Sequence, residues 1–354
     1  MQSLNGQPLV SIIINNYNYE RFLSEAIDSA LNQTYPYIEV IVVDDGSTDN
    51  SREIIAEYGD RIISIFQPNG KQAAAFNSGF AKSKGDIIIF LDADDYLFPQ
   101  AVEKIVALWK PELSKVHYRL TVVDKTRASL GYSCPQGTAP LSSGEVWKIL
   151  LDKSGYVSTP TSGNALNRCV LEKLLPIPNE YKLTADDYLS FQVPFYGDVG
   201  AIEEPLGAYR IHDTNQWALA TVSSERFQRF VRHDLQNFSL LTEKAKALGY
   251  EIPWDLEQRS TGRLWSRIIS LRLDPQKHPV KSDRSLNLIY YGIRSLWKYS
   301  DFNWQKRLFY SLWFIWVGLL PLPLAEPAMT WLYAPQHRPK PINWLFTKIR
   351  KLVS

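Results

Sequence analysis

The first hundred residues alternate short apolar runs with helical patterns, and this alternation restricts the fold more than any other feature. The apolar runs, each typical of a buried strand, are residues 10–14, 39–43, 62–66 and 87–91. The helical patterns between them are residues 20–32, 51–58 and 72–83. Strands and helices that alternate at this pace predict a parallel sheet with helices on both faces. We therefore expect an α/β fold.

Polar clusters follow three of these strands directly. They are Asn15 to Asn18, Asp44 to Ser47, and Asp92 to Asp95. In open α/β sheets, ligands bind beyond the carboxyl ends of the strands, where such clusters meet. The sequence therefore predicts a ligand site at this edge of the sheet.

The carboxylates in two of these clusters suggest what the site binds. Asp92-Ala93-Asp94 can place carboxylate oxygens on Mg²⁺ or Mn²⁺, which prefer such ligands and can also hold a diphosphate. The apolar strand before it argues against a solvated surface loop. Asp44-Asp45 has two interpretations, which stay open here: ordinary turn chemistry before a helix, or a hydrogen bond to a nucleobase or ribose.

Taken together, three motifs resemble family 2 glycosyltransferases of the GT-A fold. They are residues 10–18 (VSIIINNYN), 42–49 (VVDDGSTD) and 90–95 (FLDADD), with Asn77-Ser78-Gly79 and Gly85-Asp86 between the last two. Their order and spacing match the family over roughly residues 8 to 215. The resemblance implies a Rossmann-like nucleotide-diphospho-sugar transferase domain that binds a nucleotide-sugar donor across the strand ends.

The resemblance also implies roles for residues on the donor side. Asn15 and Tyr17 flank the base, Asp45 holds it, Asp92 contacts the ribose beside Ala93, and Asp94 ligates the cation. Lys71 approaches the base or the diphosphate, although an exposed loop lysine fits the sequence equally well. Many relatives have Pro-Thr or similar where this chain has Asn15-Asn16, so contacts with the base differ in detail.

The acceptor side matches the family at two further places. Asp186-Asp187-Tyr188 resembles the acidic pair, commonly Glu-Asp, that opens a helix, which makes Asp187 the catalytic base and Asp186 its partner. The alternative is that both carboxylates only stabilise the start of the helix. His212 resembles a histidine that approaches the metal, and the alternative is a structural role.

The chain divides into three predicted parts. Residues 8–222 form the GT-A domain, with a nucleotide-sugar half at 8–100 and an acceptor half at 101–222, where the pattern loosens into loops. Residues 223–300 form a mainly helical extension. Residues 301–354 form an apolar and basic tail.

Net charge separates this tail from the rest of the chain. The total is only +2, which argues against a nucleic-acid partner. Residues 281–354 carry eleven basic and three acidic residues, a surplus of eight that leaves −6 for the rest. Residues 308–325 have no charge, and apolar residues at 342, 345, 346, 349 and 352 recur at helical spacing beside three basic residues. The helical spacing beside basic residues is typical of a helix in an anionic membrane surface, and the alternative is a basic helix docked on its own core. For residues 308–325, a buried helix, a dimer contact and an interfacial segment stay open.

These observations predict a metal-dependent (Mn²⁺ or Mg²⁺), inverting glycosyltransferase. The expected donor is a nucleotide sugar, with a UDP-sugar favoured, and the acceptor a hydroxyl of a glycan or lipid-linked molecule in cell-surface polysaccharide or glycolipid assembly. The chain has two cysteines without a metal or redox spacing, and it lacks a signal-peptide pattern at its start. Both features favour a reducing, cytoplasmic location. With the tail pattern, we expect the protein to be peripheral on the cytoplasmic face of a membrane. The alternatives are a sugar-1-phosphate nucleotidyltransferase and an inactive, membrane-tethered nucleotide-sugar-binding protein.

Overall fold

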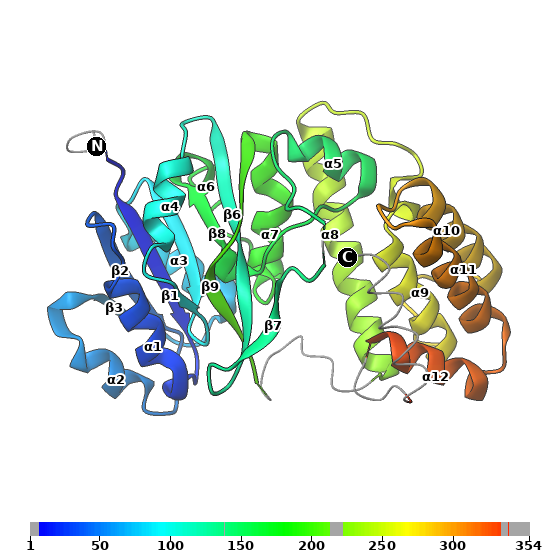
Figure 1. Cartoon of the computed structure of the whole chain (residues 1–354), viewed down its shortest axis with the longest axis horizontal. Helices are drawn as coiled ribbons and strands as arrows, with labels where there is room; N and C mark the ends of the chain where they lie inside the picture. The colour runs from blue at the N-terminus through cyan, green and yellow to red at the C-terminus, as the bar shows by residue number, and fades with distance from the viewer. Residues whose placement is uncertain (1–6, 138, 213–221, 334–338, 340–354) are drawn as a thin grey trace. The chain divides into compact units, whose positions relative to one another are not determined.

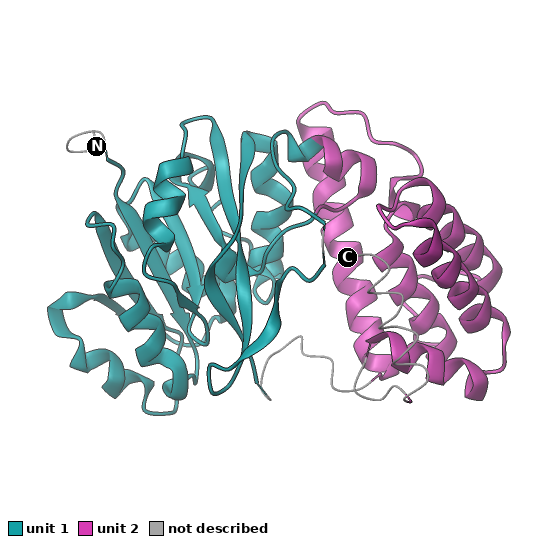
Figure 2. Ribbon diagram, in the orientation of Figure 1, with its two compact units in different colours: residues 1–147, 157–213 teal, residues 148–156, 214–354 magenta. Residues whose placement is uncertain are grey.

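The computed structural model describes residues 7–137, 139–212, 222–333 and 339. The chain forms two compact units, shown in separate colours in Figure 2. The first comprises residues 1–147 and 157–213, and the second residues 148–156 and 214–354. Each unit is described separately below.

Figure 1 labels the helices and strands along the chain. The strands are β1 (Val10–Asn16), β2 (Ile38–Asp44), β3 (Ile63–Phe66), β4 (Ile87–Asp92), β5 (Tyr96–Leu97), β6 (Leu113–Asp124), β7 (Ser129–Cys134), β8 (Asn164–Asn167) and β9 (Asp198–Ile211). The helices up to residue 213 are α1 (Glu20–Leu31), α2 (Ser51–Glu57), α3 (Lys71–Lys82), α4 (Ala101–Leu108), α5 (Val146–Lys153), α6 (Arg168–Leu171) and α7 (Ala185–Gln192). The later helices are α8 (Ser224–Ala247), α9 (Thr261–Leu273), α10 (Ser285–Lys298), α11 (Trp304–Leu319) and α12 (Leu322–Tyr333).

The first four strands form a parallel sheet in the order β3-β2-β1-β4. Because β1 lies between β2 and β4, the chain extends the sheet on one side and then crosses β1 to extend the other. The carboxyl ends of β1, β2 and β4 therefore lie side by side. Asn15 pairs in register with Asp92, and Asn16 pairs with Asp44. The polar clusters that follow these strands meet, as the sequence predicted.

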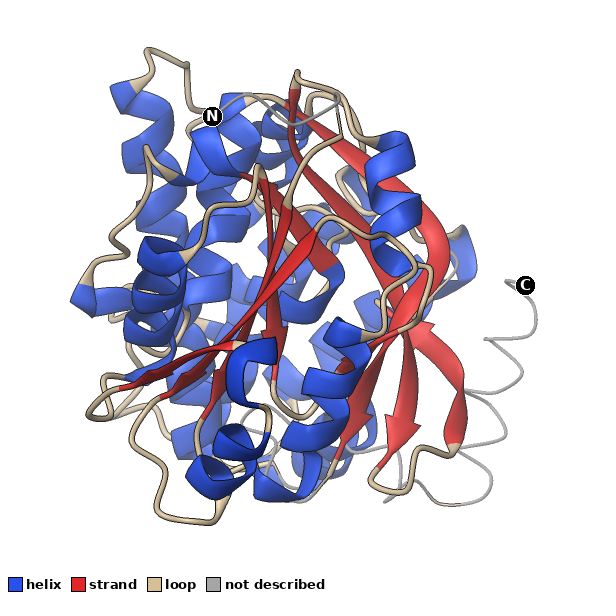
Figure 3. Cartoon of the chain, turned by 90° about the vertical axis from the view of Figure 1, so that its left-hand side faces the viewer, coloured by secondary structure: helices blue, strands red, loops and turns tan. Residues whose placement is uncertain are grey.

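Helices cover both faces of this parallel region, and Figure 3 shows the strands in red between helices in blue. The alternation of side chains along β1 explains the two layers. Ile12 and Ile14 pack with Leu23 and Ile27 of α1. Ile13 faces the opposite layer, where Gly79 brings α3 so close that a Cβ would lie 2.3 Å from the Ile13 Cγ2.

The second half of the sheet differs from the expected all-parallel arrangement. The order continues β4-β8-β6-β9-β5, with β8 antiparallel to both neighbours, β5 antiparallel to β9, and β6 parallel to β9. The sheet is therefore mixed. Its longest strands, β6 and β9, lie in the segment that the sequence pattern assigned mainly to loops.

The second unit is helical and has a core of its own. Phe227, Leu264, Leu288, Phe314 and Met329, one from each of α8 to α12, are buried in one apolar cluster. Within the described residues, no helix combines the length and apolarity needed to cross a bilayer. The predicted amphipathic helix with Ile342, Leu345, Phe346, Ile349 and Leu352 lies outside the described residues.

Candidate active site

The ends of β1 and β4 place an amide beside a carboxylate. Asn15 Nδ2 donates to Asp92 Oδ1 at 2.8 Å. The two residues are register partners on adjacent parallel strands, which fixes this contact. Asp92 also accepts a hydrogen bond from Thr161, which lies in a short 3₁₀ turn before β8. Asp92 is thus held from both sides at the edge of the sheet.

Asp94 and His212 form the second group at this edge. His212 Nε2 lies 3.0 Å from Asp94 Oδ2, and both side chains are buried. Tyr19, at the start of α1, is hydrogen-bonded to Asp94 and lies edge-on to the His212 ring. His212 follows the end of β9, about 120 residues after Asp94, so the fold brings together two groups that are distant in sequence.

Asp95 anchors the turn that carries Asp94. Its Oδ1 accepts from the Arg210 backbone N–H at 2.9 Å, and its Oδ2 accepts from Ser162 Oγ at 2.6 Å. Arg210 Nε donates to the Asp94 carbonyl at 2.7 Å, and its guanidinium pairs with Glu25. The acidic turn therefore cannot move independently of β9 and of the Thr161–Gly163 turn.

Crowded carboxylates give this site its electrostatic character. Burial and the neighbouring charge of Asp94 raise the pKa of Asp92 to about 7, against hydrogen bonds from Asn15 and Thr161 that lower it. Burial and the charges of Asp94 and Asp92 hold the pKa of Asp95 well above its usual range. The local structure therefore favours protons or cations at this point.

Asp94 and His212 fit a divalent cation whose remaining coordination positions are filled by a bound ligand and water. Asp94 and His212 supply one carboxylate and one imidazole at hydrogen-bonding distance from each other. Within the described part of the chain, no group of three or more His, Cys, Asp and Glu side chains could hold a metal ion alone. Mg²⁺ and Mn²⁺ commonly bind one or two protein ligands and take further oxygens from phosphates and water. The residues are compatible with such shared coordination.

A third group, around Asp45, shapes the loop before α3. Asp45 Oδ1 accepts from Gln67 Nε2 at 2.7 Å and from the Gly70 N–H at 2.9 Å, and its Oδ2 accepts from the Lys71 N–H at 2.7 Å. Lys71 adopts a positive φ of 69°. Its Nζ lies 5.5 Å from the centre of the Tyr17 ring, which is 43% exposed. Asp45 thus fixes the backbone of Lys71, whose ammonium group lies beside the exposed Tyr17 ring.

Asp44 has a structural role beside this group. It is fully buried, accepts from Asn16 Nδ2 at 3.1 Å and from the Ser47 N–H at 3.1 Å, and pairs with Arg52. Its oxygens therefore hold the turn after β2 rather than point to solvent.

The start of α7 carries the two predicted acceptor-side carboxylates. Asp186 and Asp187 occupy its first turn, and both are half-buried. Asp186 Oδ2 lies 3.4 Å from Thr161 Oγ1. The same Thr161 hydroxyl also lies within hydrogen-bonding reach of Asp92, and its single proton can be donated to one of the two carboxylates at a time. One threonine therefore lies between the carboxylate that ends β4 and a carboxylate in the first turn of α7. The structure thus brings the donor-side and acceptor-side motifs together.

Sequence reasoning missed three residues of this site. Tyr19, Thr161 and Arg210 contact the acidic cluster through hydrogen bonds. Tyr19 stands next to the first motif, and Arg210 stands two residues before His212, so their proximity was a usable signal. Thr161 carries no motif spacing, and only the fold shows its place.

The α/β sheet, with carboxylates gathered at its carboxyl edge beside a second acidic pair on a helix, agrees with the glycosyltransferase fold that the sequence motifs resemble. Residues 11–126 match the family described as Glycosyl transferase family 2. An uncharacterized glycosyltransferase of Nostoc sp. is 39% identical over 225 residues, which cover 61% of this chain and 69% of that protein. The chain therefore belongs to glycosyltransferase family 2 and is a glycosyltransferase.

Two other comparisons extend this result. Hyaluronan synthase of Pasteurella multocida is 47% identical over 103 residues, which cover 28% of this chain and 11% of that protein. The structure of S. aureus TarS residues 1–349, in complex with UDP-GlcNAc, is 14% identical, with a TM-score of 0.53 over 93% of both chains. This similarity supports the GT-A fold.

Proposed function

We propose that this protein is a metal-dependent, inverting glycosyltransferase that takes a sugar from a UDP-sugar. The observation that carries the proposal is the placement of Thr161 between Asp92 and Asp186, with Asp187 next along α7. A donor bound at the strand ends then presents its sugar to a carboxylate that can accept a proton. The UDP moiety is favoured by the family resemblance, and the TarS structure bound to UDP-GlcNAc supports it.

We assign the donor-binding residues to the three groups at the sheet edge. Asn15 and Tyr17 flank the base, and Asp45, which fixes the loop before α3, also holds the base. Asp92, which is held by Asn15 and Thr161, contacts the ribose next to the buried Ala93. Lys71 extends its ammonium group over Tyr17, from where it can approach the base or the diphosphate.

Asp94 and His212 would hold the cation. When bound, Mn²⁺ or Mg²⁺ stabilises the negative charge of the departing diphosphate. Tyr19 and Arg210 keep Asp94 in place through its side chain and its carbonyl. His212 is fixed between Tyr19 and Phe22, whose rings lie 5.7 and 5.0 Å from its own.

Asp187 acts as the general base in the transfer. The acceptor hydroxyl oxygen forms the new bond to the anomeric carbon on the face opposite the diphosphate, whose bond to that carbon breaks. The hydroxyl proton passes to the Asp187 carboxylate, a step worth about 10²- to 10⁴-fold in rate. Asp186, held through Thr161, positions the start of α7. We propose a glycan or a lipid-linked molecule as the acceptor, in cell-surface polysaccharide or glycolipid assembly.

The base assignment is tested with Asp187→Asn. We expect transfer to fall by at least about a hundredfold while the affinity for UDP stays within about twofold, because the amide cannot accept the proton but occupies the same space. Asp198→Asn, an exposed carboxylate at the start of β9, is the control. Full transfer by Asp187→Asn contradicts the assignment.

Two assays on the unaltered protein test the alternative functions. Release of pyrophosphate from a sugar phosphate and a nucleoside triphosphate would indicate a sugar-1-phosphate nucleotidyltransferase. Binding of the donor without turnover would indicate an inactive nucleotide-sugar-binding protein.

The cation assignment is tested with Asp94→Asn in a titration of UDP against Mn²⁺. We expect the unaltered protein to bind UDP more tightly with Mn²⁺ than with EDTA, and the variant to lose most of this gain, because a neutral amide is a weaker ligand than a carboxylate. Equal gains in the two proteins would disprove a role for Asp94 in holding the cation.

We also propose that the C-terminal helical region contacts an anionic membrane surface, on its cytoplasmic face. Five side chains of α11 are 39–57% exposed although they are large and apolar: Leu308, Leu312, Ile315, Trp316 and Leu319. Their spacing places them on one side of the helix. Lys306 and Arg307 stand at its first turn. An apolar face with nearby cations is the pattern of a helix that lies in a lipid interface.

A further inference from the structure

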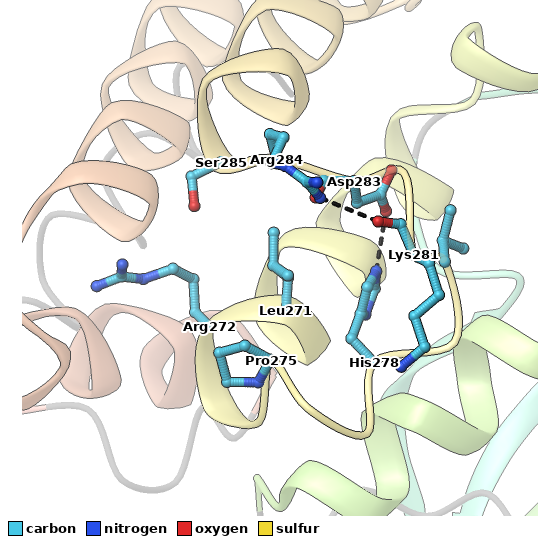
Figure 4. Close-up of a pocket in the computed structure, with 9 residues that line it drawn as sticks. Leu271, Arg272, Pro275, His278, Lys281, Asp283, Arg284 and Ser285 are labelled. Carbon is cyan, nitrogen blue, oxygen red and sulfur yellow. Dashed lines mark hydrogen bonds and ion pairs between the residues drawn. The ribbon is translucent and has the colours of Figure 1, made fainter.

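A cavity of about 350 Å³ lies in the helical unit, apart from the residues assigned to glycosyl transfer. Figure 4 shows its lining, which comes from the end of α9, the loop that follows and the first residue of α10. Three cationic side chains contribute to it: Arg272, Lys281 and Arg284. A concave site with several cations is suited to an anion.

The cations have no carboxylate partner within the described residues. The Arg272 guanidinium donates to the Leu320 carbonyl, Lys281 Nζ donates to the Gln276 carbonyl at 2.9 Å, and Arg284 Nη1 donates to the carbonyls of Lys281 and Asp283. Arg272 Nε is buried and lacks a hydrogen-bond partner there. Carbonyls orient these side chains without neutralising them, so their positive charge remains available to a ligand.

The one carboxylate in the lining, Asp283, is already neutralised. Arg267 Nε donates to its Oδ2 at 2.7 Å, a second Arg267 nitrogen bonds its Oδ1, and His278 Nε2 lies 2.9 Å from its Oδ2. His278 is itself held by Ser270 Oγ at 3.0 Å. Asp283 is therefore a buried support for the loop, and it compensates Arg267 rather than the cations of the cavity.

The start of α10 adds hydrogen-bond donors to the same cavity. Ser285 is the first residue of the helix and lines the cavity with its side chain. The preceding residue, Arg284, makes no side-chain cap hydrogen bond. The first N–H groups of a helix have no partner within the helix and favour anions. The lining thus includes cations, a hydroxyl and a helix start, and Figure 4 shows the Arg272 and Lys281 side chains extending in different directions along it.

Two exposed leucines, one adjacent in the chain to a lining residue and one hydrogen-bonded to a lining residue through its carbonyl, indicate what the anion is attached to. Leu286, beside Ser285, is 69% exposed. Leu320, whose carbonyl accepts from Arg272, is 39% exposed. We propose that this cavity binds a phosphate group, either free or as the headgroup of a lipid whose apolar part lies against these leucines. This site shares no residue with the proposed donor site, and Leu320 directly follows α11, whose exposed face is the proposed membrane contact.

Two soluble probes distinguish free phosphate from a lipid headgroup. The first is inorganic phosphate at constant ionic strength in chloride, and the second is dihexanoyl phosphatidic acid below its micelle concentration. We expect saturable binding of at least one probe by the full chain, measured by calorimetry. Lys281→Gln should weaken it roughly tenfold or more, since it removes a charge-assisted hydrogen bond. Lys277→Gln, an equal loss of charge outside the lining, is the control and should bind normally. Binding of both probes with equal affinity identifies phosphate alone as the ligand, and tighter binding of the lipid identifies a headgroup.

Ser285→Ala provides a milder second variant, because it removes one hydroxyl and no charge. It should weaken binding severalfold while thermal unfolding and UDP binding stay unchanged. The proposal is overturned if neither probe saturates, if Lys281→Gln binds like the unaltered protein, or if Lys277→Gln weakens binding equally. Because UDP binding is followed in the same samples, failure of this site and failure of the proposed transferase site are told apart.

Discussion

Lys115 and His117 stand on one side of β6, and both side chains are buried. Lys115 Nζ donates to Asn164 Oδ1 at 2.9 Å and to Ser158 Oγ at 3.3 Å, and a His117 ring nitrogen lies 2.8 Å from the Ser142 carbonyl. Burial, with the nearby charge of Lys115, lowers the pKa of His117 from 6.5 to about 3. The fold therefore keeps this imidazole neutral beside a buried ammonium group.

This residue predicts a pH dependence of stability. Below pH 6.5 the unfolded chain takes up a proton at His117 that the folded protein does not bind, so the free energy of unfolding decreases as the pH falls from 6.5 towards 3. The contribution is about 1.4 kcal/mol per pH unit in that window. His117→Gln keeps a hydrogen-bond donor but does not titrate, so its unfolding midpoint in urea should depend less steeply on pH.

The control for this measurement is Gln136→Asn, an exposed amide that does not titrate. Its slope of stability against pH should match that of the unaltered protein. If His117→Gln also keeps the full slope between pH 6 and pH 4, the neutral state of His117 is not what makes the fold sensitive to acid.

At the scale of elements, the close approach of α3 to the sheet depends on Gly79. A Cβ there would lie 2.3 Å from Ile13 Cγ2 and 3.2 Å from Val43 Cγ2, and both of these atoms belong to buried strands. We expect Gly79→Ala to destabilise the first unit by roughly 1–3 kcal/mol, because overpacking outweighs the gain in helix propensity. Thermal unfolding measures the effect.

Gly262 offers a matched control for this substitution. It lies in α9, and a Cβ built on it meets no atom within 4 Å. Gly262→Ala should leave stability unchanged or raise it by up to about 1 kcal/mol. Equal effects of the two alanines would show that α3 can shift away from the sheet without cost.

The elements also show how far the sequence predicts this fold. Strands β1, β2 and β4 are buried on both faces, so their continuous apolar runs identify them. The strand β6 buries Lys115 and His117, whose partners Asn164 (in β8) and Ser142 are distant in sequence, so its composition does not resemble that of a core strand. The strand-end carboxylates were predictable because they directly follow these apolar strands. The contact of Thr161 with Asp92 and Asp186 was not predictable, because it depends on how the fold places a short turn that carries no motif.

At the scale of the whole molecule, the near-zero net charge combines an acidic part and a basic part. Residues 281–354 carry a surplus of eight positive charges, and the rest of the chain has a net charge of −6. The carboxylates of the proposed donor site belong to the acidic part, and the cations of the proposed phosphate site and those near α11 lie mostly in the basic part. This division supports separate ligands for the two units: a donor diphosphate that shares a cation in the first, and anionic groups bound directly in the second.

The exposed apolar side chains of α11 lie together on one side of the helix, unlike isolated leucines on a protein surface. They therefore predict binding to lipid vesicles. We expect Leu308→Ser, Leu312→Ser and Leu319→Ser combined to reduce sedimentation with phosphatidylglycerol-containing vesicles by more than about tenfold, since each leucine loses part of the 1.5–3 kcal/mol that full burial of its side chain supplies. The matched control changes three exposed leucines of the first unit, Leu108, Leu130 and Leu183, to serine. If both triple variants sediment equally with these vesicles, α11 is not the contact, and its exposed face must serve another purpose. If the unaltered protein binds vesicles of phosphatidylcholine alone just as well, the basic residues beside α11 have no part in the attachment.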